Sequence, residues 1–497
     1  MTSKDAASSS LGGQAARGAG STMLGQIIRI AIQLLSVVVL ARFLDPKDYG
    51  IIAMVTAVIG IADVVRDFGL SSAAVQAASL SKAERDQLFW INTGLGALLA
   101  ALCCLSAPLL AALYGDQAIV AVTIALSSTF LINGMASQYR ASLMRSLQFG
   151  RVAAADVLAA TVGLAAAVLY ATLSPTYWAI VVQQTSVAVV GLLVVISFAR
   201  WLPGRPRKTV PLRRFYRYGG NLSAAQLMVY LTSNLDSVLL GVIAGPTVLG
   251  QYNRAFQLFM LPLRQISAPA TRVALPVLSR LQHDARRFDE FLLRGQAVVV
   301  HVVIFALMFA GAFADSLIPL VLGPGWEGVI PIFQVLTFAG IAQVAGYASY
   351  WVFLARGLTG SNLRFSLVTR PFFIAAIVVG SFYGAVGTAA GVTAGTALTW
   401  VAGLVWVSRA ADAPGLQMFV NALRPFLVYG VSSYGASWVI QRYSFSSAPV
   451  GSAVIGLVAV LVLSWVAYLC WPGFRRDVRG LLQVASLMKS RGRLSGP

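Results

Sequence analysis

Charged residues are scarce in this sequence. They make up 11% of its 497 residues, whereas an average soluble domain contains about 25%. Hydrophobic residues make up 58%, and the mean hydropathy is +0.77. This composition indicates an integral membrane protein and excludes a soluble enzyme.

Cysteine and histidine are also rare. The three cysteines, Cys103, Cys104 and Cys470, lie in apolar runs, where thiols behave as small hydrophobic groups rather than as a disulfide framework. The two histidines, His283 and His301, are too few for a histidine-based metal cluster. The sequence therefore predicts no metal site and no cofactor.

A cleavable signal peptide is not expected, because residues 1–20 are small and polar and the first apolar run is too long for a signal. A window of about 20 residues predicts an all-α membrane protein with about fourteen spans. Their approximate bounds are 23–44, 49–70, 88–113, 118–139, 152–173, 178–200, 218–243, 248–275, 291–313, 328–354, 363–382, 385–408, 423–440 and 449–471.

The basic residues alternate with the spans. If the N-terminus is inside, the inside loops carry the arginine clusters, and the outside loops carry only Lys47 and Arg442 as basic residues. Cytoplasmic loops collect lysine and arginine, so both termini are predicted to be cytoplasmic. The formal net charge of +20 follows from these loops and does not require a nucleic-acid partner.

An internal repeat appears when the chain is shifted by 200 residues. Pro46 then aligns with Pro246 and Gly50 aligns with Gly250, at the same position relative to the spans. Six spans per half keep the same topology, which predicts two lobes related by an axis along the membrane normal. The expected segments are a cytoplasmic tail 1–22, an N-lobe 23–200, a basic linker 201–217, a C-lobe 218–408, two further spans within 409–471 and a basic cytoplasmic tail 472–497.

Several short motifs carry a family resemblance. The motifs are Ala41-Arg42-Phe43-Leu44-Asp45-Pro46-Lys47-Asp48-Tyr49-Gly50, Asp67-Phe68-Gly69-Leu70, Ala74-Val75-Gln76, Leu249-Gly250-Gln251-Tyr252 and Pro276-Val277-Leu278-Ser279-Arg280-Leu281. With these motifs the chain resembles the polysaccharide-transporter branch of the multidrug/oligosaccharidyl-lipid/polysaccharide (MOP) flippase superfamily. The resemblance implies two six-helix lobes around a central cavity. It also implies outward flipping of undecaprenyl-diphosphate-linked oligosaccharides in the bacterial cytoplasmic membrane, as in Wzx-type members.

Polar and charged residues gather on single faces of three spans. Charged side chains at membrane depth are costly and are functional candidates by default. With 3.6 residues per turn, each of the following sets falls on one face of its helix. The sets are Gln26, Arg29 and Gln33 in span 1; Asp63, Arg66 and Asp67 in span 2; and Arg254, Gln257, Arg264, Gln265 and Arg272 in span 8.

Two interpretations of these arginines remain open. In the first, Arg29, Arg66, Arg254 and Arg264 line a cavity and bind a diphosphate, because guanidinium groups match phosphate oxygens. In the second, the arginines pair with acidic residues such as Asp63 and Asp67 or extend to the membrane surface. The resemblance to the lipid II flippase branch, with cavity arginines on spans 1, 2 and 8, favours the first interpretation.

Asp236 in span 7 also has two interpretations. It could form an ion pair with Arg370, or it could take part in proton coupling. A sodium site of the kind found in some relatives is doubtful, because span 11 contains no acidic residue. Span 8 also carries Pro262, Pro269 and Pro276, which favour kinks and a moving helix.

The predicted function is therefore a non-enzymatic flippase for surface polysaccharides such as lipopolysaccharide, capsule or exopolysaccharide. A multidrug exporter of the same fold is the alternative, and a membrane glycosyltransferase or polymerase is less favoured because the outside loops are short. The expected partners are an undecaprenyl-diphosphate-linked glycan, membrane lipids and polysaccharide polymerase or assembly proteins. The protein is expected to act as a monomer.

Overall fold

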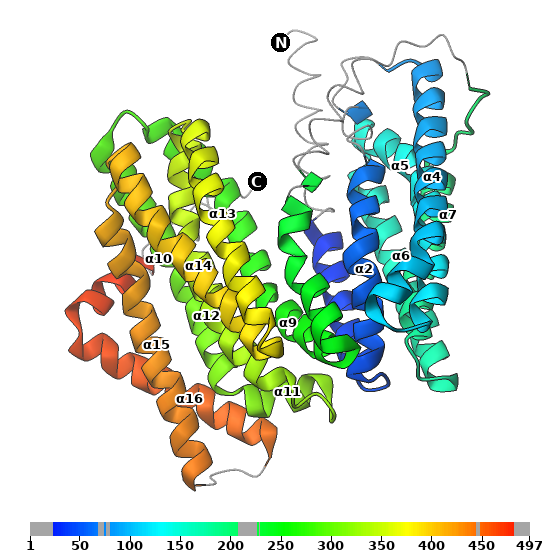
Figure 1. The fold of residues 1–497 in the computed structure, drawn as a ribbon. Coiled ribbons are helices and arrows are strands. Elements are labelled where there is room, and N and C mark those ends of the chain that lie inside the picture. The colour runs from blue at the N-terminus through cyan, green and yellow to red at the C-terminus, as the bar shows by residue number, and fades with distance from the viewer. Residues whose placement is uncertain are drawn as a thin grey trace, which may run out of the picture. The chain divides into compact units, whose positions relative to one another are not determined.

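The computed structural model describes residues 23–67, 74–75, 80–206, 226–227, 229–443 and 448–481. Within these ranges the chain forms helices and no strands (Figure 1). The helices are Met23–Ala41, α2 Pro46–Asp67, α4 Lys82–Tyr114, α5 Ala118–Arg145, α6 Phe149–Leu173, α7 Trp178–Ala199, α9 Leu235–Leu281, α10 Ala285–Ala312, α11 Ala314–Leu322, α12 Val329–Ala355, α13 Thr359–Ser381, α14 Gly384–Ala411, α15 Gly415–Tyr443 and α16 Pro449–Cys470.

Eleven helices in the described ranges are long and apolar enough to cross a membrane. Each coincides with one predicted span, which confirms an all-α membrane protein. The other three predicted spans overlap α9, α15 and a segment before Leu235 that is only partly described. The count of about fourteen stays a prediction.

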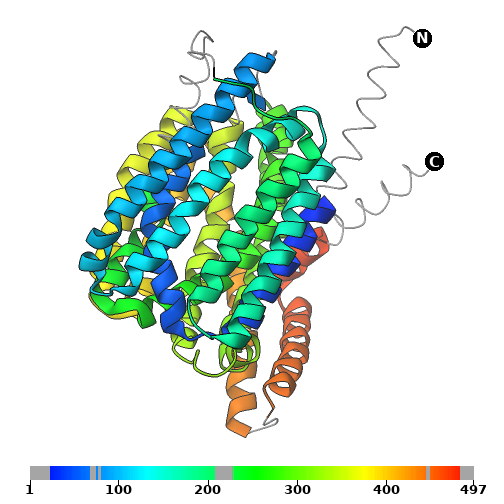
Figure 2. The same cartoon turned by 90° about the vertical axis from the view of Figure 1, so that its right-hand side faces the viewer.

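The chain divides into two compact units, Met1–Gly250 and Gln251–Pro497, called here unit 1 and unit 2. Unit 1 therefore contains the predicted linker and the first span predicted for the C-lobe. In unit 1, α4 packs along α5, α7 packs on both α5 and α6, and α2 contacts α4 and α5. Figure 2 shows α4 and α5 side by side.

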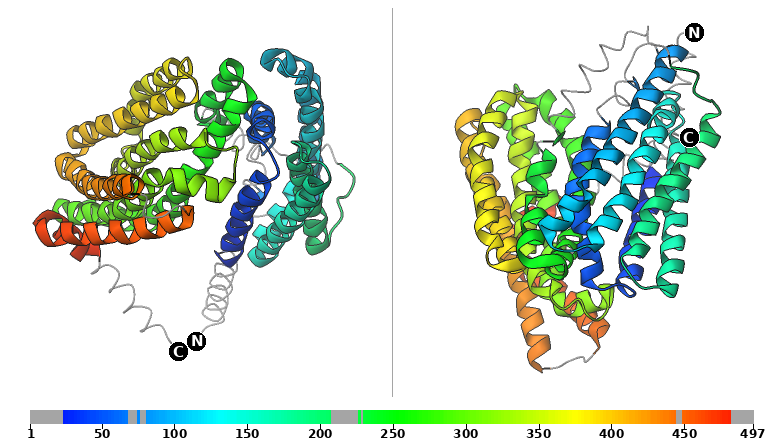
Figure 3. Two further views of the ribbon diagram at one scale, coloured as in Figure 1. Left: turned by 90° about the horizontal axis from the view of Figure 1, so that it is seen from below. Right: turned by 45° about the vertical axis from the view of Figure 1, so that its right-hand side comes forward.

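In unit 2, α12 is buried along most of its length and packs against α10 and α14. The helix α13 packs on α14, and α15 packs on α10. The helix α16 contacts α15 and α11 and buries only Gly456 and Val460, so it lies at the edge of the unit (Figure 3). An apolar helix with so little buried surface is expected to face lipid.

The helix α9 passes from one unit into the other, because the boundary follows Gly250. One residue inside it has non-helical backbone angles, Gly245, with φ 80° and ψ −179°. The three prolines that predict kinks all lie downstream of this break. The interruption of α9 therefore comes from a glycine directly before Pro246, which begins the second helical part.

The described start of the predicted linker is docked on unit 1. The Trp201 ring lies under the Arg85 guanidinium at 4.0 Å and beside Tyr139, with ring centroids 4.7 Å apart. The Trp90 indole N–H donates to the carbonyl oxygen of Gly204 at 2.8 Å. Residues 201–206 are therefore held at the first turns of α4. The remainder of the linker lies outside the described residues.

Candidate functional site

The two repeated Pro-x-x-x-Gly segments contact each other within unit 1. A methyl group added at Gly50 would overlap the carbonyl oxygen of Pro246, and one added at Gly250 would overlap the carbonyl oxygen of Pro46. Only glycine allows two backbones to approach this closely. The contact is reciprocal between positions 200 residues apart, which supports the internal repeat. It fixes the first turns of the helices that carry Arg66 and Arg254.

A second contact holds the segment before α9 against α2. The Tyr230 hydroxyl donates to the carbonyl oxygen of Thr56 at 3.0 Å, and it lies where a side chain at Gly60 would stand. The helix α2 therefore provides backbone surface to Pro246 near its start and to Tyr230 one turn before Asp63. Both contacts position the charged end of α2.

At that end, the Arg66 guanidinium donates to the Asp63 carboxylate. The Arg66 side chain is 20% exposed and that of Asp63 is 53% exposed. The pair is three residues apart, so it lies on one helix face, as the sequence predicts. Asp67 is the last residue of α2, and its side chain lies outside the described residues. The positive charge of Arg66 is thus partly balanced within its own helix.

The part of α9 in unit 2 has two contrasting faces. Tyr252, Ala255, Phe259 and Leu263 are each at most 1% exposed, and Phe259 and Leu263 lie beside Gly340 of α12. The predicted arginine stripe lies on the opposite side, about 120–220° from Tyr252 at 100° per residue. On this stripe Arg254 is half-buried, while the side chains of Arg264, Gln265 and Arg272 are exposed.

The best-defined contact on this stripe joins Arg254 and Gln257. The Arg254 guanidinium donates to the Gln257 carboxamide oxygen at 2.6 Å. An amide orients the guanidinium without neutralising it, unlike the carboxylate beside Arg66. The sequence between Gln251 and Leu281 contains no Asp or Glu. The stripe is therefore basic, and the only acidic residue of α9, Asp236, lies before this part of the helix.

The remaining predicted site residues lie apart from these contacts. Arg29 is exposed on the helix Met23–Ala41. Asp236 is 5% exposed, and its carboxylate accepts a hydrogen bond from the Ser237 N–H at 2.7 Å. Asp236 belongs to unit 1, whereas the exposed Arg370 belongs to α13 in unit 2. Their ion pair and the proton-coupling alternative both stay predictions.

The structure contains two ion pairs whose partners the sequence did not predict. Arg140 of α5 contacts Asp156 of α6 at 2.6 Å, and Arg424 of α15 contacts Asp477 at 3.0 Å. Both pairs join different helices, so no helical spacing in the sequence reveals them. The described residues contain no group of three or more His, Cys, Asp or Glu side chains that could hold a metal.

Comparison with known proteins agrees with this architecture. The family model described as "Polysaccharide biosynthesis protein" matches residues 39–331. The lipopolysaccharide biosynthesis protein WzxC of Escherichia coli K12 is 26% identical over 386 residues, which cover 77% of this chain and 78% of that protein. The succinoglycan biosynthesis transport protein ExoT of Rhizobium meliloti 1021 is 21% identical over 487 residues, which cover 97% of both chains.

Solved structures share the fold. A lipid II flippase MurJ in an inward closed conformation superimposes with a TM-score of 0.67 at 14% identity, covering 90% of this chain and 98% of that one. An inward-facing multidrug resistance MATE transporter of the MOP superfamily gives a TM-score of 0.59 at 13% identity, covering 78% and 98%. The chain therefore belongs to the polysaccharide biosynthesis protein family, and it shares its fold with these membrane proteins.

Proposed function

We propose that this protein flips undecaprenyl-diphosphate-linked oligosaccharides from the inner to the outer leaflet of the bacterial cytoplasmic membrane. The family is one of polysaccharide biosynthesis, and the relatives are named for lipopolysaccharide, teichuronic acid and succinoglycan pathways. In the proposed pathway a polysaccharide unit is built inside, is attached to a lipid carrier and crosses the membrane to be used outside. The proposal adds the carrier, the direction of transport and the binding residues to the family assignment.

The arginine stripe of α9 carries the proposal. Arg264 and Arg272 are exposed, and they form no ion pair with a carboxylate of the described residues. Charged groups at membrane depth face water or protein rather than lipid. Exposed arginines such as Arg264 and Arg272, on a helix whose other face is buried, are therefore suited to an aqueous path for an anion. A diphosphate is the anion that a lipid-linked glycan presents.

The proposed mechanism uses arginines in both units. Arg254 and Arg264 in unit 2, and Arg29 and Arg66 in unit 1, each bind the diphosphate during alternating access. A charged headgroup that leaves water needs compensating charge, since burial of an unpaired ion costs several kcal/mol. The guanidinium fork donates parallel hydrogen bonds to phosphate oxygens and is less strongly hydrated than an ammonium group. Arg66 has the weaker role, because Asp63 already balances it.

The membrane potential favours this direction. With both termini cytoplasmic, as the loop charges predict, the diphosphate moves from a negative interior to the outside. One charge that crosses 100 mV contributes about 2.3 kcal/mol. A headgroup of charge near −2 gains about twice that amount if its charge is not compensated during transfer. Export then requires no coupled ion.

The alternative is a multidrug exporter, because a MATE transporter has the same fold. The charge of α9 argues against it. An exporter of organic cations needs acidic groups in its path, and residues 251–281 contain four arginines and no Asp, Glu or Lys. The lipid-linked anion is therefore the better match to this helix.

The test compares arginines on and off the stripe. Arg254→Ala and Arg264→Ala are expected to lower flippase activity by about tenfold or more, because each removes a guanidinium group that compensates the charge of the diphosphate. Arg254→Lys and Arg264→Lys are expected to recover it in part, since lysine keeps the charge and loses the fork. Arg280→Ala is the matched control, because Arg280 is exposed at the end of the same helix and lies off the stripe.

The measurement is restoration of surface polysaccharide in a strain that lacks its own flippase, together with the membrane level of each variant. The expected result is loss of polysaccharide for the two alanine variants at normal membrane level, with Arg280→Ala active. Full activity of well-expressed Arg254→Ala and Arg264→Ala proteins would show that these arginines have a structural role and would remove the main support for the proposal.

A further inference from the structure

A short helix over residues 472–481 follows α16 directly. Its inner face is fixed to unit 2 by two side chains. Phe474 is 2% exposed, and its ring packs against the rings of His301 and Tyr429, with both centroid distances 5.7 Å. Since His301 lies on α10 and Tyr429 on α15, this one aromatic side chain joins the short helix to both.

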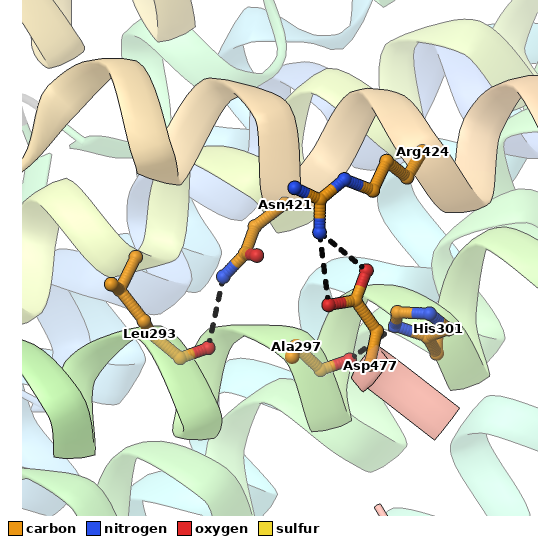
Figure 4. Close-up of polar contacts among 6 residues, drawn as sticks. All are labelled: Leu293, Ala297, His301, Asn421, Arg424 and Asp477. Atoms are coloured by element: carbon orange, nitrogen blue, oxygen red, sulfur yellow. Dashed lines mark hydrogen bonds and ion pairs between the residues drawn. The ribbon is translucent and has the colours of Figure 1, made fainter. Parts of the chain in front are cut away.

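An ion pair one turn further along completes the attachment. Arg424 Nη1 lies 3.0 Å from each carboxylate oxygen of Asp477 (Figure 4). The Asp477 side chain is only 9% exposed. Figure 4 also shows the adjoining contact in which the Asn421 carboxamide donates to the carbonyl oxygen of Leu293, which ties α15 to α10. The position of helix 472–481 is therefore determined by contacts on the packed part of unit 2.

The Arg475 side chain forms hydrogen bonds with the C-terminal end of α16. Its guanidinium donates to the carbonyl oxygens of Tyr468, at 3.0 Å from Nε, and of Leu469. The last carbonyl groups of a helix have no partner within the helix, so these bonds stabilise the terminus. Of the four charged residues in helix 472–481, Arg475 and Asp477 are thus used in holding it.

Arg476 and Arg479 are the two that remain, and both side chains are exposed. They are three residues apart, which places their Cβ atoms about 5–6 Å from each other on one face. Neither forms an ion pair with a carboxylate among the described residues. Arg479 Nε also lies 3.4 Å from the Tyr468 hydroxyl, which orients its guanidinium beside the end of α16.

The location of this pair indicates its ligand. It follows an apolar span with little buried surface and the half-exposed Trp471. Tryptophan and tyrosine near the end of a span mark the level of lipid headgroups. Two arginines held at this level, with no acidic partner, are positioned to donate hydrogen bonds to a phosphate group.

We propose that Arg476 and Arg479 form a binding site for the headgroup of an anionic phospholipid, and that the Arg424–Asp477 pair positions this site by docking helix 472–481. The partner is a membrane lipid and not the transported molecule. The proposal therefore does not depend on which substrate the protein carries.

The experiment uses the full-length protein in phosphatidylcholine nanodiscs that contain increasing amounts of phosphatidylglycerol. Hydrogen exchange of residues 472–481 reports occupancy, and native mass spectrometry counts bound phosphatidylglycerol. The variant is Arg476→Gln with Arg479→Gln. The control is Arg286→Gln with Arg287→Gln, because those two arginines are 86% and 72% exposed and each has an acidic partner, Glu290 or Asp284.

Phosphatidylglycerol is expected to slow exchange in the unchanged protein. The Arg476/Arg479 variant is expected to bind it about 30-fold more weakly, which is about 2 kcal/mol at 1.4 kcal/mol per factor of ten and corresponds to two basic residues near an anionic surface. The control is expected to keep its affinity. Equal losses in the variant and the control, or no loss in either, would overturn the assignment of this site.

A second variant tests the positioning contact. Asp477→Asn keeps both arginines and removes a negative charge, so a purely electrostatic tail would bind phosphatidylglycerol more tightly. If docking creates the site, the same change instead weakens binding several-fold and speeds exchange of residues 472–481. Unchanged or tighter binding by Asp477→Asn would contradict the positioning role.

Discussion

The segments 46–50 and 246–250 begin two helices in the same way but are held by different means. In the first, the Asp48 carboxylate accepts hydrogen bonds from the N–H groups of Asp45 at 3.1 Å and Tyr177 at 2.9 Å. In the second, the residues between Pro246 and Gly250 are Thr247, Val248 and Leu249, and the turn is made by Gly245 at φ 80°.

This difference distinguishes the structural features that both copies of the repeat share from the helix cap, which differs between them. Both copies have proline at the first helical position, where no N–H donor is needed. Both have glycine four residues later, where the two backbones meet. The cap is an acidic side chain in one copy and a glycine backbone conformation in the other. The close backbone contact is therefore the shared requirement.

The largest expected effect comes from filling that contact. Gly50→Ala and Gly250→Ala each place a methyl group onto a backbone carbonyl oxygen, which cannot rotate away as a side chain can. Each substitution is expected to cost about 3 kcal/mol or more, the upper end of overpacking, and the two costs should be similar because the contact is reciprocal. Apparent melting temperatures of purified protein in detergent measure this.

Gly94→Ala is the control for this pair. Gly94 lies within α4, and no atom lies within 4 Å of the position its Cβ would take. Alanine is favoured over glycine inside a helix by about 1 kcal/mol, so this substitution should be neutral or stabilising. A Gly50→Ala protein as stable as Gly94→Ala would mean that the close contact does not form.

The sequence was sufficient for the features that depend on local pattern. Eleven spans coincide with long apolar helices, because hydropathy is summed over one continuous segment. The Asp63–Arg66 pair was predictable because residues three apart share a helix face. The repeat was visible as matching Pro46 and Pro246, although the sequence did not indicate that the two copies touch.

The features that escaped prediction depend on which distant segments meet. Arg424 and Asp477 are 53 residues apart, and nothing in their spacing pairs them. The break in α9 lies at Gly245 rather than near the three prolines, because proline within a membrane helix is tolerated when neighbouring groups satisfy the freed carbonyls. The positive φ value of Gly245 does not affect hydropathy, so the sequence indicates it only through a glycine that directly precedes a proline.

A smaller loss of stability is expected when the backbone turn at Gly245, which takes the place of a side-chain cap in the second copy, is changed. The angles of Gly245 fall in a region that is accessible almost only to glycine, and occupation by another residue costs about 1–3 kcal/mol. Gly245→Ala should therefore lower stability by about 2 kcal/mol through strain alone, since no atom lies within 4 Å of the added Cβ. The melting temperature of Gly245→Ala in the same detergent tests this. Stability equal to that of the unchanged protein would mean that the turn adapts at no cost.

The smallest effect belongs to the side-chain cap of the first copy. Asp48→Ala removes the acceptor of two backbone N–H groups, one of them on Tyr177 at the start of α7. Loss of such a cap costs about 1 kcal/mol. The aligned residue in the second copy is Val248, and Thr247 is the polar side chain between Pro246 and Gly250. Thr247→Ala should change stability by less than about 0.5 kcal/mol. Melting temperatures of the two variants, compared with Gly245→Ala, measure the contrast. If Thr247→Ala destabilises as much as Asp48→Ala, the two copies share a side-chain cap after all, and the division between a carboxylate in one copy and a glycine turn in the other is wrong.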